Sequence, residues 1–243
     1  MFDKYKKNFF SQNGEDGVIL ELLKRLKLKK KILWCCEFGA WDGIHGSNTF
    51  NLVKKYNFKA VFIEGDKNRF KDLLKTKKKY SKIIAFNNFV DWKKKSINSL
   101  YKILKKTKIP KDFEILSIDI DSYDLNVWKS LIYYRPKIVI IEINSGIKPG
   151  IIQIHSKTNV GNSFTSTLNY AKKIGYVLVC HTGNCIFIKK KYINKIGIKK
   201  KYIDNPELLF DGAWLYKKEN KLKRYIIKFL PNRMLDLLRK IKR

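Results

Sequence analysis

Short apolar runs alternate along this chain with segments in which apolar residues recur every three or four positions. The runs predict buried strands at residues 32–38, 59–64, 82–87, 113–119 and 137–143. The amphipathic segments predict helices at residues 15–28, 47–56, 67–78, 93–107, 124–132 and about 163–174. Two more apolar runs, 175–180 and 184–189, flank a turn of hairpin length and predict an antiparallel pair.

Strands that alternate with helices predict an α/β fold with a parallel sheet and right-handed crossovers. The closing hairpin adds antiparallel strands, so we expect a Rossmann-like, doubly wound, mostly parallel sheet of seven strands. We expect residues 1–216 to form this single domain.

Two helices carry local signals that the structure can check. Ser47 precedes an apolar segment and is expected to be the N-cap of the helix over 47–56. In the segment 93–107, helical spacing places Ile97, Leu100, Tyr101 and Leu104 on one buried face.

The chain of 243 residues has 53 Lys+Arg against 21 Asp+Glu, a formal charge of +32. Most of the basic residues are lysines, which fits compositional bias of the genome as well as selected attraction to an anionic partner. Residues 217–243 form a basic amphipathic segment broken at Pro231. Such a segment binds an anionic membrane surface, or packs its apolar stripe on the domain.

The four cysteines do not have the spacing of a disulfide scaffold or a zinc site. Cys35 and Cys36 are adjacent in a strand, so they point to opposite faces. We expect buried free thiols in a reducing compartment. The first residues have no apolar signal region, and no apolar run approaches the roughly 20 residues of a membrane span. We therefore expect a cytoplasmic protein, with peripheral contact to the inner face of the membrane if the tail binds lipid.

Acidic residues gather where the predicted strands end. Of the 21 acids, nine follow a strand directly or closely: Glu37, Asp42, Glu64, Asp66, Asp91, Asp119, Asp121, Asp124 and Glu142. Ligands of open α/β sheets bind outside the carboxyl ends of the strands. These acids are therefore the strongest functional signal in so basic a chain.

The turn after the first strand, EFGAWDG at 37–43, contains Gly39 and Gly43 but lacks both the dinucleotide fingerprint and the P-loop pattern. An acidic rim around a glycine turn fits a cofactor with ribose hydroxyls and positive charge but no phosphate, such as S-adenosylmethionine. Glu64 lies 25 residues after Gly39, near the roughly 20 expected for a ribose-binding acid, and would accept from both ribose hydroxyls.

From about Ser11 to Ile188 the chain resembles the FkbM-like class I S-adenosylmethionine-dependent methyltransferases. The motifs that carry the resemblance are SQNGEDGVI (11–19), EFGAWDGIHGSNTFNL (37–52), VFIEGD (61–66), LSIDIDSYDLNVWKSL (116–131), VIIEIN (139–144) and GYVLVCHTGNCIFI (175–188). Ser122 departs from the family pattern, in which we expect glycine in this turn. The resemblance implies a seven-stranded fold and methyl transfer to oxygen, often on a sugar or glycolipid hydroxyl.

The resemblance also implies a set of cofactor-binding residues. Glu37, Gly39 and Gly43 match the first cofactor motif, Glu64 matches the ribose acid, and Gln12, Gly14, Glu15 and Asp16 match an N-terminal segment, within residues 11–28, that would cover the cofactor. To these we add neighbours at the strand ends, namely Ala40, Asn48, Gly65, Asp66, Asp91 and Asp119.

An acceptor hydroxyl must lose its proton, either to a general base or with help from a metal. Asp119, Asp121, Glu142 and Asn144 all offer oxygen at the ends of neighbouring strands, which suits Mg²⁺. The same acids could act directly, with Asp121 and Glu142 as base and substrate binder. In a third interpretation they only cap the next helix, for which Asp124 is the best candidate.

Two histidines need a separate assignment. His45, in the loop after the glycine turn, is a second candidate base, and a solvated surface position suits it equally well. His181, in the hairpin turn, is given no role.

We expect the acceptor to be a sugar, a glycan or another small molecule, covered by the loop 145–162. The charge also favours a nucleic-acid methyltransferase, but the chain lacks the N-P-P-[FY] motif and a Pro-Cys pair, so we do not expect nucleic acid as a partner. A third hypothesis is a non-catalytic, basic module that binds S-adenosylmethionine, against which the intact acids argue.

Overall fold

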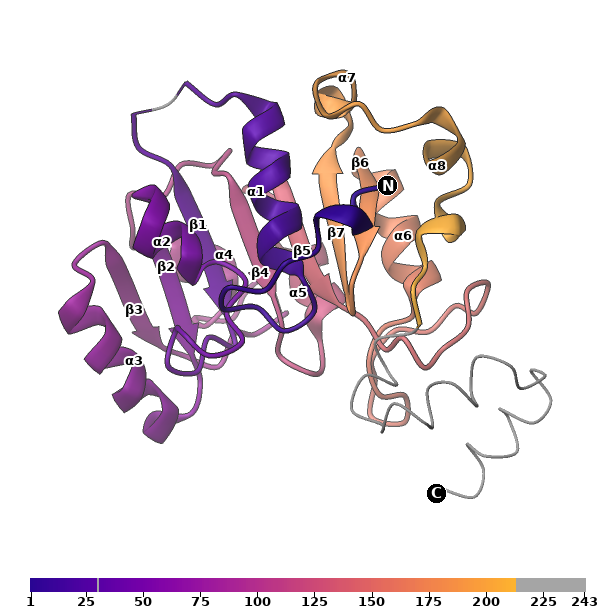
Figure 1. The fold of residues 1–243 in the computed structure, drawn as a ribbon. Coiled ribbons are helices and arrows are strands. Elements are labelled where there is room, and N and C mark those ends of the chain that lie inside the picture. The colour runs from indigo at the N-terminus through magenta and orange to yellow at the C-terminus, as the bar shows by residue number, and fades with distance from the viewer. Residues whose placement is uncertain (30, 213–243) are drawn as a thin grey trace, which may run out of the picture.

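The computed structural model describes residues 1–29 and 31–212. Seven strands form one sheet in the order β3-β2-β1-β4-β5-β7-β6 (Figure 1). The strands are β1 (Trp34–Phe38), β2 (Lys59–Glu64), β3 (Ile83–Asn87), β4 (Ile115–Ile118), β5 (Ile138–Glu142), β6 (Tyr176–His181) and β7 (Asn184–Lys189). The first five strands are parallel, and β7 is antiparallel to both β5 and β6. The predicted fold class is confirmed.

Helices cover both faces of this sheet (Figure 1). They are α1 (Glu15–Leu26), α2 (Phe50–Tyr56), α3 (Lys67–Lys79), α4 (Leu100–Lys105), α5 (Asp124–Ser130), α6 (Phe164–Lys173), α7 (Ile193–Ile196) and α8 (Lys200–Asp204). Short 3-10 helices lie at η1 (Asp3–Tyr5), η2 (Lys190–Tyr192) and η3 (Pro206–Leu209). The first five strands follow the 3-2-1-4-5 order of the Rossmann fold, so the crevice for a ligand lies where the order reverses, between β1 and β4.

Two helices begin later than the sequence predicts. The N-cap of α2 is Thr49, not Ser47. The Ser47 hydroxyl instead accepts from the backbone N–H of Phe50 at 2.9 Å, and the Glu37 carboxylate accepts from the N–H of Asn48. Because side chains already bind these N–H groups, the chain stays in a turn until Phe50.

The second late start is that of α4, which begins at Leu100 instead of residue 93. The Asp91 N–H donates to the Asn98 carbonyl, and Asp91 and Ser99 form an isolated bridge, so residues 91–99 close into a loop. Ile97, predicted on the buried face, is 67% exposed in this loop.

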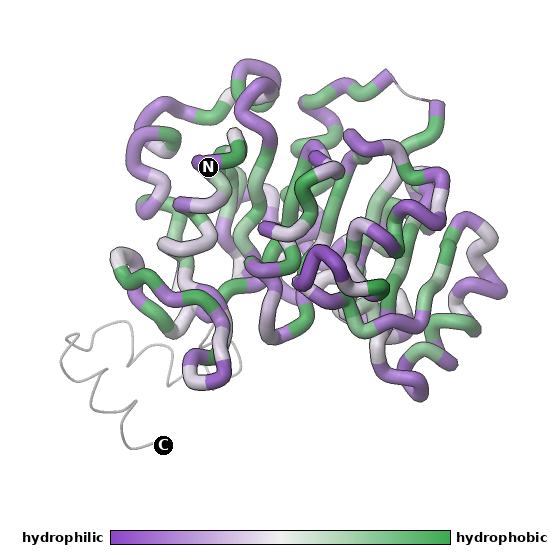
Figure 2. Tube along the Cα trace, turned by 180° about the vertical axis from the view of Figure 1, so that it is seen from behind, coloured by the Kyte–Doolittle hydropathy of each residue, from purple (hydrophilic) through white to green (hydrophobic). Residues whose placement is uncertain are grey.

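The core lies in two layers, one on each face of the sheet. One layer contains Cys36 and packs the strands against α4, α5 and α6, while the other contains Cys35 and packs them against α1, α2, α3 and α7. Figure 2 shows hydrophobic residues along the strands and hydrophilic residues along the outer helices. Adjacent cysteines therefore do point to opposite faces, as the pleat requires.

All four cysteines lie among the described residues as buried free thiols, as predicted. No helix among the described residues is long and apolar enough to cross a membrane. The basic segment 217–243 and the end of the predicted domain at 216 lie outside the described residues, so both stay predictions.

A buried ion pair joins the amino ends of three strands. It lies at the edge of the sheet opposite the acids that follow the strands. Lys137, which is 4% exposed, places its ammonium 2.9 Å from Glu114, which is fully buried. The other oxygen of Glu114 accepts from the Trp34 N–H at 2.7 Å. The pair therefore links the starts of β1, β4 and β5.

Replacing one partner of this pair is expected to cost much more than replacing both. Lys137→Met removes the Lys137 ammonium from a buried carboxylate and should lower the free energy of unfolding by about 3–5 kcal/mol. Lys137→Met/Glu114→Gln removes both charges and keeps an acceptor for Trp34, so it should recover most of that loss. Urea denaturation of the three proteins measures this, and equal destabilisation of single and double variants would contradict it.

Candidate functional site

A pocket of about 490 Å³ opens at the carboxyl edge of the sheet, where the loops after β1, β2 and β4 meet. Eight of the predicted cofactor residues line it: Gln12, Glu37, Gly39, Ala40, Glu64, Gly65, Asp66 and Asp119. His45 and Asp121 line it as well. The strand-order switch thus brings together residues that are more than 100 positions apart in sequence.

Gly39 allows the closest approach of two chain segments in this pocket. Its φ is +74°, and a Cβ atom there would overlap the carbonyl oxygen of Asp119. Only glycine satisfies both conditions without moving the end of β4. The first motif glycine therefore sets the distance between the loop after β1 and the acids after β4.

Glu64 ends β2 and is 6% exposed. Its two carboxylate oxygens accept from the backbone N–H groups of Trp41 and Asp66, at 2.7 and 2.8 Å. Each carboxylate oxygen has a further lone pair, so Glu64 can still accept from two hydroxyl groups in the pocket. Its position suits a ribose, and its backbone contacts hold it there.

Glu37 has a mainly structural set of contacts. Its carboxylate accepts from the Ser47 hydroxyl at 2.8 Å, the Thr49 hydroxyl at 2.5 Å and two backbone N–H groups at the start of α2. Burial nevertheless outweighs these hydrogen bonds and raises the pKa of Glu37. Glu37 thus fastens the loop after β1 to α2 while one side of it lines the pocket.

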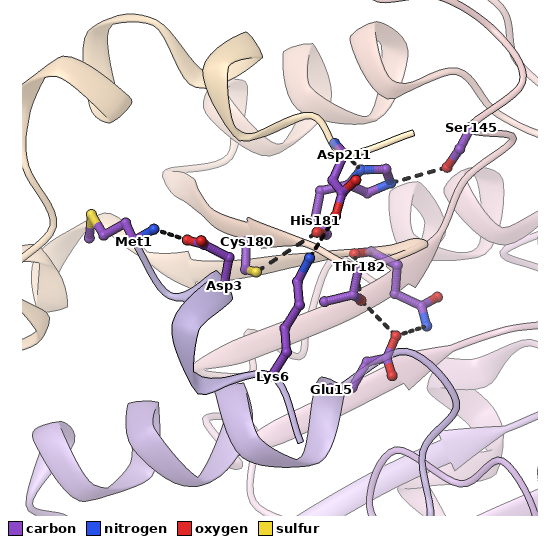
Figure 3. A network of polar contacts seen from close by, with 10 residues as sticks. Met1, Asp3, Lys6, Glu15, Ser145, Cys180, His181, Thr182 and Asp211 are labelled. Carbon is purple, nitrogen blue, oxygen red and sulfur yellow. Dashed lines mark hydrogen bonds and ion pairs between the residues drawn. The ribbon is translucent and has the colours of Figure 1, made fainter. Parts of the chain in front are cut away.

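The N-terminal segment reaches the pocket through one residue. Gln12 lines it and lies against Gly46, where a Cβ would come within 2.6 Å of the Gln12 amide nitrogen. Glu15 is turned away and accepts from the Thr182 hydroxyl at 2.6 Å in the hairpin (Figure 3). Asp16 accepts from three successive N–H groups of residues 9–11, and Gly14, the N-cap residue of α1, has a φ of +97°. Glu15, Asp16 and Gly14 therefore hold the segment in place and do not line the pocket.

Three more predicted cofactor residues lie outside that pocket. Gly43 packs on the core, where a Cβ would come within 2.9 Å of the Phe62 ring. Asn48 donates to the Ser117 hydroxyl and lines a separate space of about 60 Å³. Asp91 accepts from the Lys93 N–H in the loop before α4. Asp66, which does line the pocket, also caps α3 by accepting from two backbone N–H groups.

Asp119, Asp121 and Glu142 form a cluster in which one oxygen of each lies within 4.8 Å of the others. Burial, and then repulsion from the neighbouring carboxylates, raises the pKa of Asp119 to about 7 and that of Glu142 to about 9. Three carboxylates this close cannot all be ionised, so near neutral pH the cluster retains a proton. It can therefore give up or accept a proton at working pH, or exchange the proton for a cation.

Asp121 has a left-handed backbone, with φ +56°. Asp tolerates this conformation better than most residues, but it is uncommon outside glycine and is found at functional sites. Ser122, where we expected glycine, has no positive φ, because the left-handed position of this turn is one residue earlier. The Asp124 carboxylate holds the turn by accepting from the N–H groups of Ile120 and Ser122.

Asn144 and His45 have contacts that set them apart from this cluster. Asn144 accepts from the Gly146 N–H and donates to the Val160 carbonyl, so its amide is engaged in a loop. His45 is exposed, and its Nδ1 lies 2.5 Å from Asp42. His45 lines the larger pocket, whereas Asp121 lines this pocket and a second one of about 200 Å³ beside it.

Sequence reasoning missed several residues that line the larger pocket. Phe89 is 74% exposed, and its ring occupies the space in which a Cβ of Gly65 would lie. The Arg69 guanidinium lies 5.5 Å above the Trp41 ring. Neither residue belongs to a periodic pattern or a motif. An aromatic residue directly after a strand, as in the sequence NNFVD at 87–91, was the available signal for Phe89.

Another concavity lies away from this site. A groove of about 600 Å³ lies between α1 and the amino ends of β1 and β2, with mostly apolar lining such as Leu20, Leu28 and Phe58. It contains no cluster of acids, and the chemistry predicted for this chain lies at the opposite edge of the sheet.

Among solved structures, the chain resembles M. capricolum TrmK in complex with S-adenosylhomocysteine, with 15% identity, 91% of this chain and 93% of that chain covered, and a TM-score of 0.45. It also resembles the N-terminal domain of EvdMO1 in the presence of S-adenosylhomocysteine and D-fucose, with 8% identity, 73% and 82% covered, and a TM-score of 0.46. A third similar structure is the CurJ carbon methyltransferase, with 8% identity, 72% and 52% covered, and a TM-score of 0.47.

The first two of these structures were obtained with S-adenosylhomocysteine, and the third is a carbon methyltransferase. No family model and no curated protein matches the chain. The fold class is therefore assigned from the strand order of this chain, and the resemblance to FkbM-like enzymes stays a prediction.

The acid cluster is expected to make stability depend on pH. The folded-state pKa values of Asp119 and Glu142 are raised, so the folded protein binds more protons than the unfolded chain and loses stability as pH rises through about 7 to 9. Asp119→Asn removes one charge and should raise the Tm at pH 9, by about 2–4 °C per kcal/mol of repulsion removed.

At pH 5 Asp119 and Glu142 are largely protonated in the wild type, so the Tm difference should shrink there. Differential scanning calorimetry from pH 5 to 9 measures the trend. Asp72→Asn, at an exposed acid of α3, serves as the control and should show a flat difference. A constant or falling difference for Asp119→Asn would refute the mutual repulsion.

Proposed function

We propose that this protein transfers the methyl group of S-adenosylmethionine to an oxygen atom of a sugar, a glycan or another small hydroxyl compound. The observation that carries the proposal is the cluster of Asp119, Asp121 and Glu142, which joins a pocket suited to the cofactor to a second pocket suited to an acceptor. The proposed activity needs a proton acceptor at this junction, and the cluster supplies one.

The residues of the larger pocket fit S-adenosylmethionine. Gly39 and Gly65 let the Asp119 carbonyl and the Phe89 ring pack closely at the pocket wall, and the buried carboxylate of Glu64 retains lone pairs for two hydroxyls. Phe89 offers an exposed ring on which a nucleobase can stack. The acids of the lining favour a cation without phosphate. When bound, the cofactor supplies a methyl group on a positively charged sulfur with a good leaving group.

The protein's own task is to orient the acceptor oxygen and take its proton. Asp121 lines both pockets, so it lies on the path between cofactor and acceptor. Burial, followed by repulsion from neighbouring carboxylates, raises the pKa values of Asp119 and Glu142 and so keeps a carboxylate of the cluster basic near neutral pH. Because displacement at methyl needs little besides alignment, positioning and proton removal account for the catalysis we propose.

The same carboxylates also suit Mg²⁺, which prefers oxygen ligands and retains several waters. A cation would take the place of the shared proton and make the acceptor hydroxyl more acidic. Base and metal versions require the same three side chains and differ in their response to a chelator.

Cofactor binding is expected to depend on Glu64. Glu64→Ala removes charge-assisted hydrogen bonds and should weaken binding of S-adenosylhomocysteine by roughly 1.5–3 kcal/mol. Glu64→Gln retains the shape and should give a smaller loss, while Asp72→Asn on α3 should bind like the wild type. Isothermal titration calorimetry provides the affinities. If folded Glu64 variants bind S-adenosylhomocysteine as tightly as the wild type does, Glu64 is not a binding residue and the cofactor does not bind in this pocket.

Turnover is expected to depend on Asp121. Asp121→Asn retains the left-handed backbone, which Asn tolerates, but cannot accept a proton, so methyl transfer should fall by about 10²–10⁴-fold. Affinity for S-adenosylhomocysteine should stay near that of the wild type. The assay follows labelled methyl transfer from S-adenosylmethionine to a panel of monosaccharides and polyols. Asp204→Asn, an exposed acid of α8, is the control.

The pH and chelator arms of this assay separate the two versions. If the cluster acts as a base, the rate of methyl transfer should rise with pH and should not change when EDTA is added. If the cluster binds a metal, EDTA should abolish the activity and Mg²⁺ should restore it. Near-normal turnover of Asp121→Asn in both arms would exclude Asp121 and favour His45 as the base.

A further inference from the structure

The second pocket, of about 200 Å³, lies between the end of β5 and the loop that precedes α6. At roughly 30 Å³ per water it has the volume of about seven waters, which suits a small molecule. Asp121 and Glu142 line one part of it, and Ser145 and Asn162 line another. The polar groups outside the acid cluster determine which hydrogen-bonding groups a ligand of this pocket needs.

Asn162 carries a buried donor without a partner. The residue is 1% exposed, and its side-chain oxygen accepts from the His155 N–H at 3.1 Å. That contact orients the amide, and its Nδ2 has no hydrogen-bond partner within residues 1–29 and 31–212. A buried amide left unsatisfied is costly, so such a group in a pocket is a place for a ligand oxygen.

Ser145 supplies a second donor because His181 fixes its hydroxyl. The Nε2 of His181 lies 3.1 Å from the Ser145 oxygen, and the backbone N–H of Asp211 donates to Nδ1 at 2.9 Å (Figure 3). A neutral ring that accepts at Nδ1 carries its proton on Nε2, so Nε2 donates to Ser145. The hydroxyl hydrogen of Ser145, which is 5% exposed, is then left for an acceptor in the pocket.

The ring of His181 is held neutral and in one orientation. It is 1% exposed and stacks on Phe210 with ring centroids 5.0 Å apart and an angle of 13° between the planes. Burial lowers its pKa to about 4, although the charge of Asp211 opposes this. The direction of the Ser145 hydroxyl is therefore the same throughout the neutral range.

We propose that the second pocket selects acceptors with two neighbouring oxygens, such as the vicinal diol of a sugar or polyol. One hydroxyl donates to the carboxylates of Asp121 and Glu142, and the adjacent oxygen accepts from Asn162 and Ser145. Asn162 and Ser145 are binding residues, and His181 is a positioning residue that acts through Ser145. This selection rests on the proposed function, since it gives that acceptor site its substrate class.

Binding of two simple probes tests the selection without turnover. The protein saturated with S-adenosylhomocysteine is titrated with trans-1,2-cyclohexanediol and with cyclohexanol, and affinities are obtained by ligand-observed NMR. The wild type should bind the diol more tightly. Asn162→Ala and Ser145→Ala should each weaken diol binding by about 3- to 10-fold and leave cyclohexanol unchanged. Asn159→Ala, an exposed asparagine of the same loop, is the matched control.

The positioning role of His181 is tested by a separate pair of variants. His181→Phe retains an aromatic ring on Phe210 but removes the donor at Nε2, so it should reduce diol binding as Ser145→Ala does. The double variant His181→Phe/Ser145→Ala should bind no more weakly than Ser145→Ala alone. Additive losses would assign His181 a general structural role.

Failure of this inference is distinguishable from failure of the proposed function. Equal affinity of the wild type for diol and cyclohexanol, or unchanged diol binding in Asn162→Ala, overturns the selection while leaving cofactor binding intact. Absence of S-adenosylhomocysteine binding overturns the proposed function, and the diol preference is then measured on the protein alone. Affinity for S-adenosylhomocysteine in every variant reports whether the fold is preserved.

Discussion

Buried carboxylates that accept backbone N–H groups hold the carboxyl edge of this sheet in shape. Glu37 binds the start of α2, Glu64 binds the loops after β1 and β2, and Asp124 binds the turn after β4. Each satisfies donors that a loop would otherwise leave unpaired away from water. The pockets exist because these loops are fixed at a distance from one another.

This arrangement explains why the acids at the strand ends have two different functions. Those bound to backbone N–H groups are structural, although some also face the pocket. Asp119, Asp121 and Glu142 mainly face one another, and burial raises the pKa values of Asp119 and Glu142. The repulsion within the cluster costs stability, and a proton, a cation or an acceptor hydroxyl relieves it. A cluster that is costly to ionise is the kind of feature that a catalytic site retains.

The surroundings of the second pocket depend on contacts between distant parts of the chain. The N-terminal segment binds the hairpin through Glu15 and Thr182, and the segment after α8 reaches His181 through the backbone of Asp211 (Figure 3). His181 in turn contacts Ser145 after β5. The segment after α8 thus sets, through His181, the orientation of one hydroxyl in the second pocket. His181, for which the sequence predicted no role, acquires these contacts only in the folded chain.

The sequence by itself determined the order of strands and helices, the two-faced burial of Cys35 and Cys36, and the gathering of acids at one edge, because periodicity and strand direction are local properties. It could not tell that Asn144 binds its own loop, that Asp121 and not Ser122 takes the left-handed turn, or that Ile97 is exposed. It also gave no sign that the Nδ2 of Asn162 has no hydrogen-bond partner among the described residues. Only the tertiary structure decided these points, because a polar side chain acquires its role from the groups within hydrogen-bond distance, and those come from segments that the sequence does not place side by side.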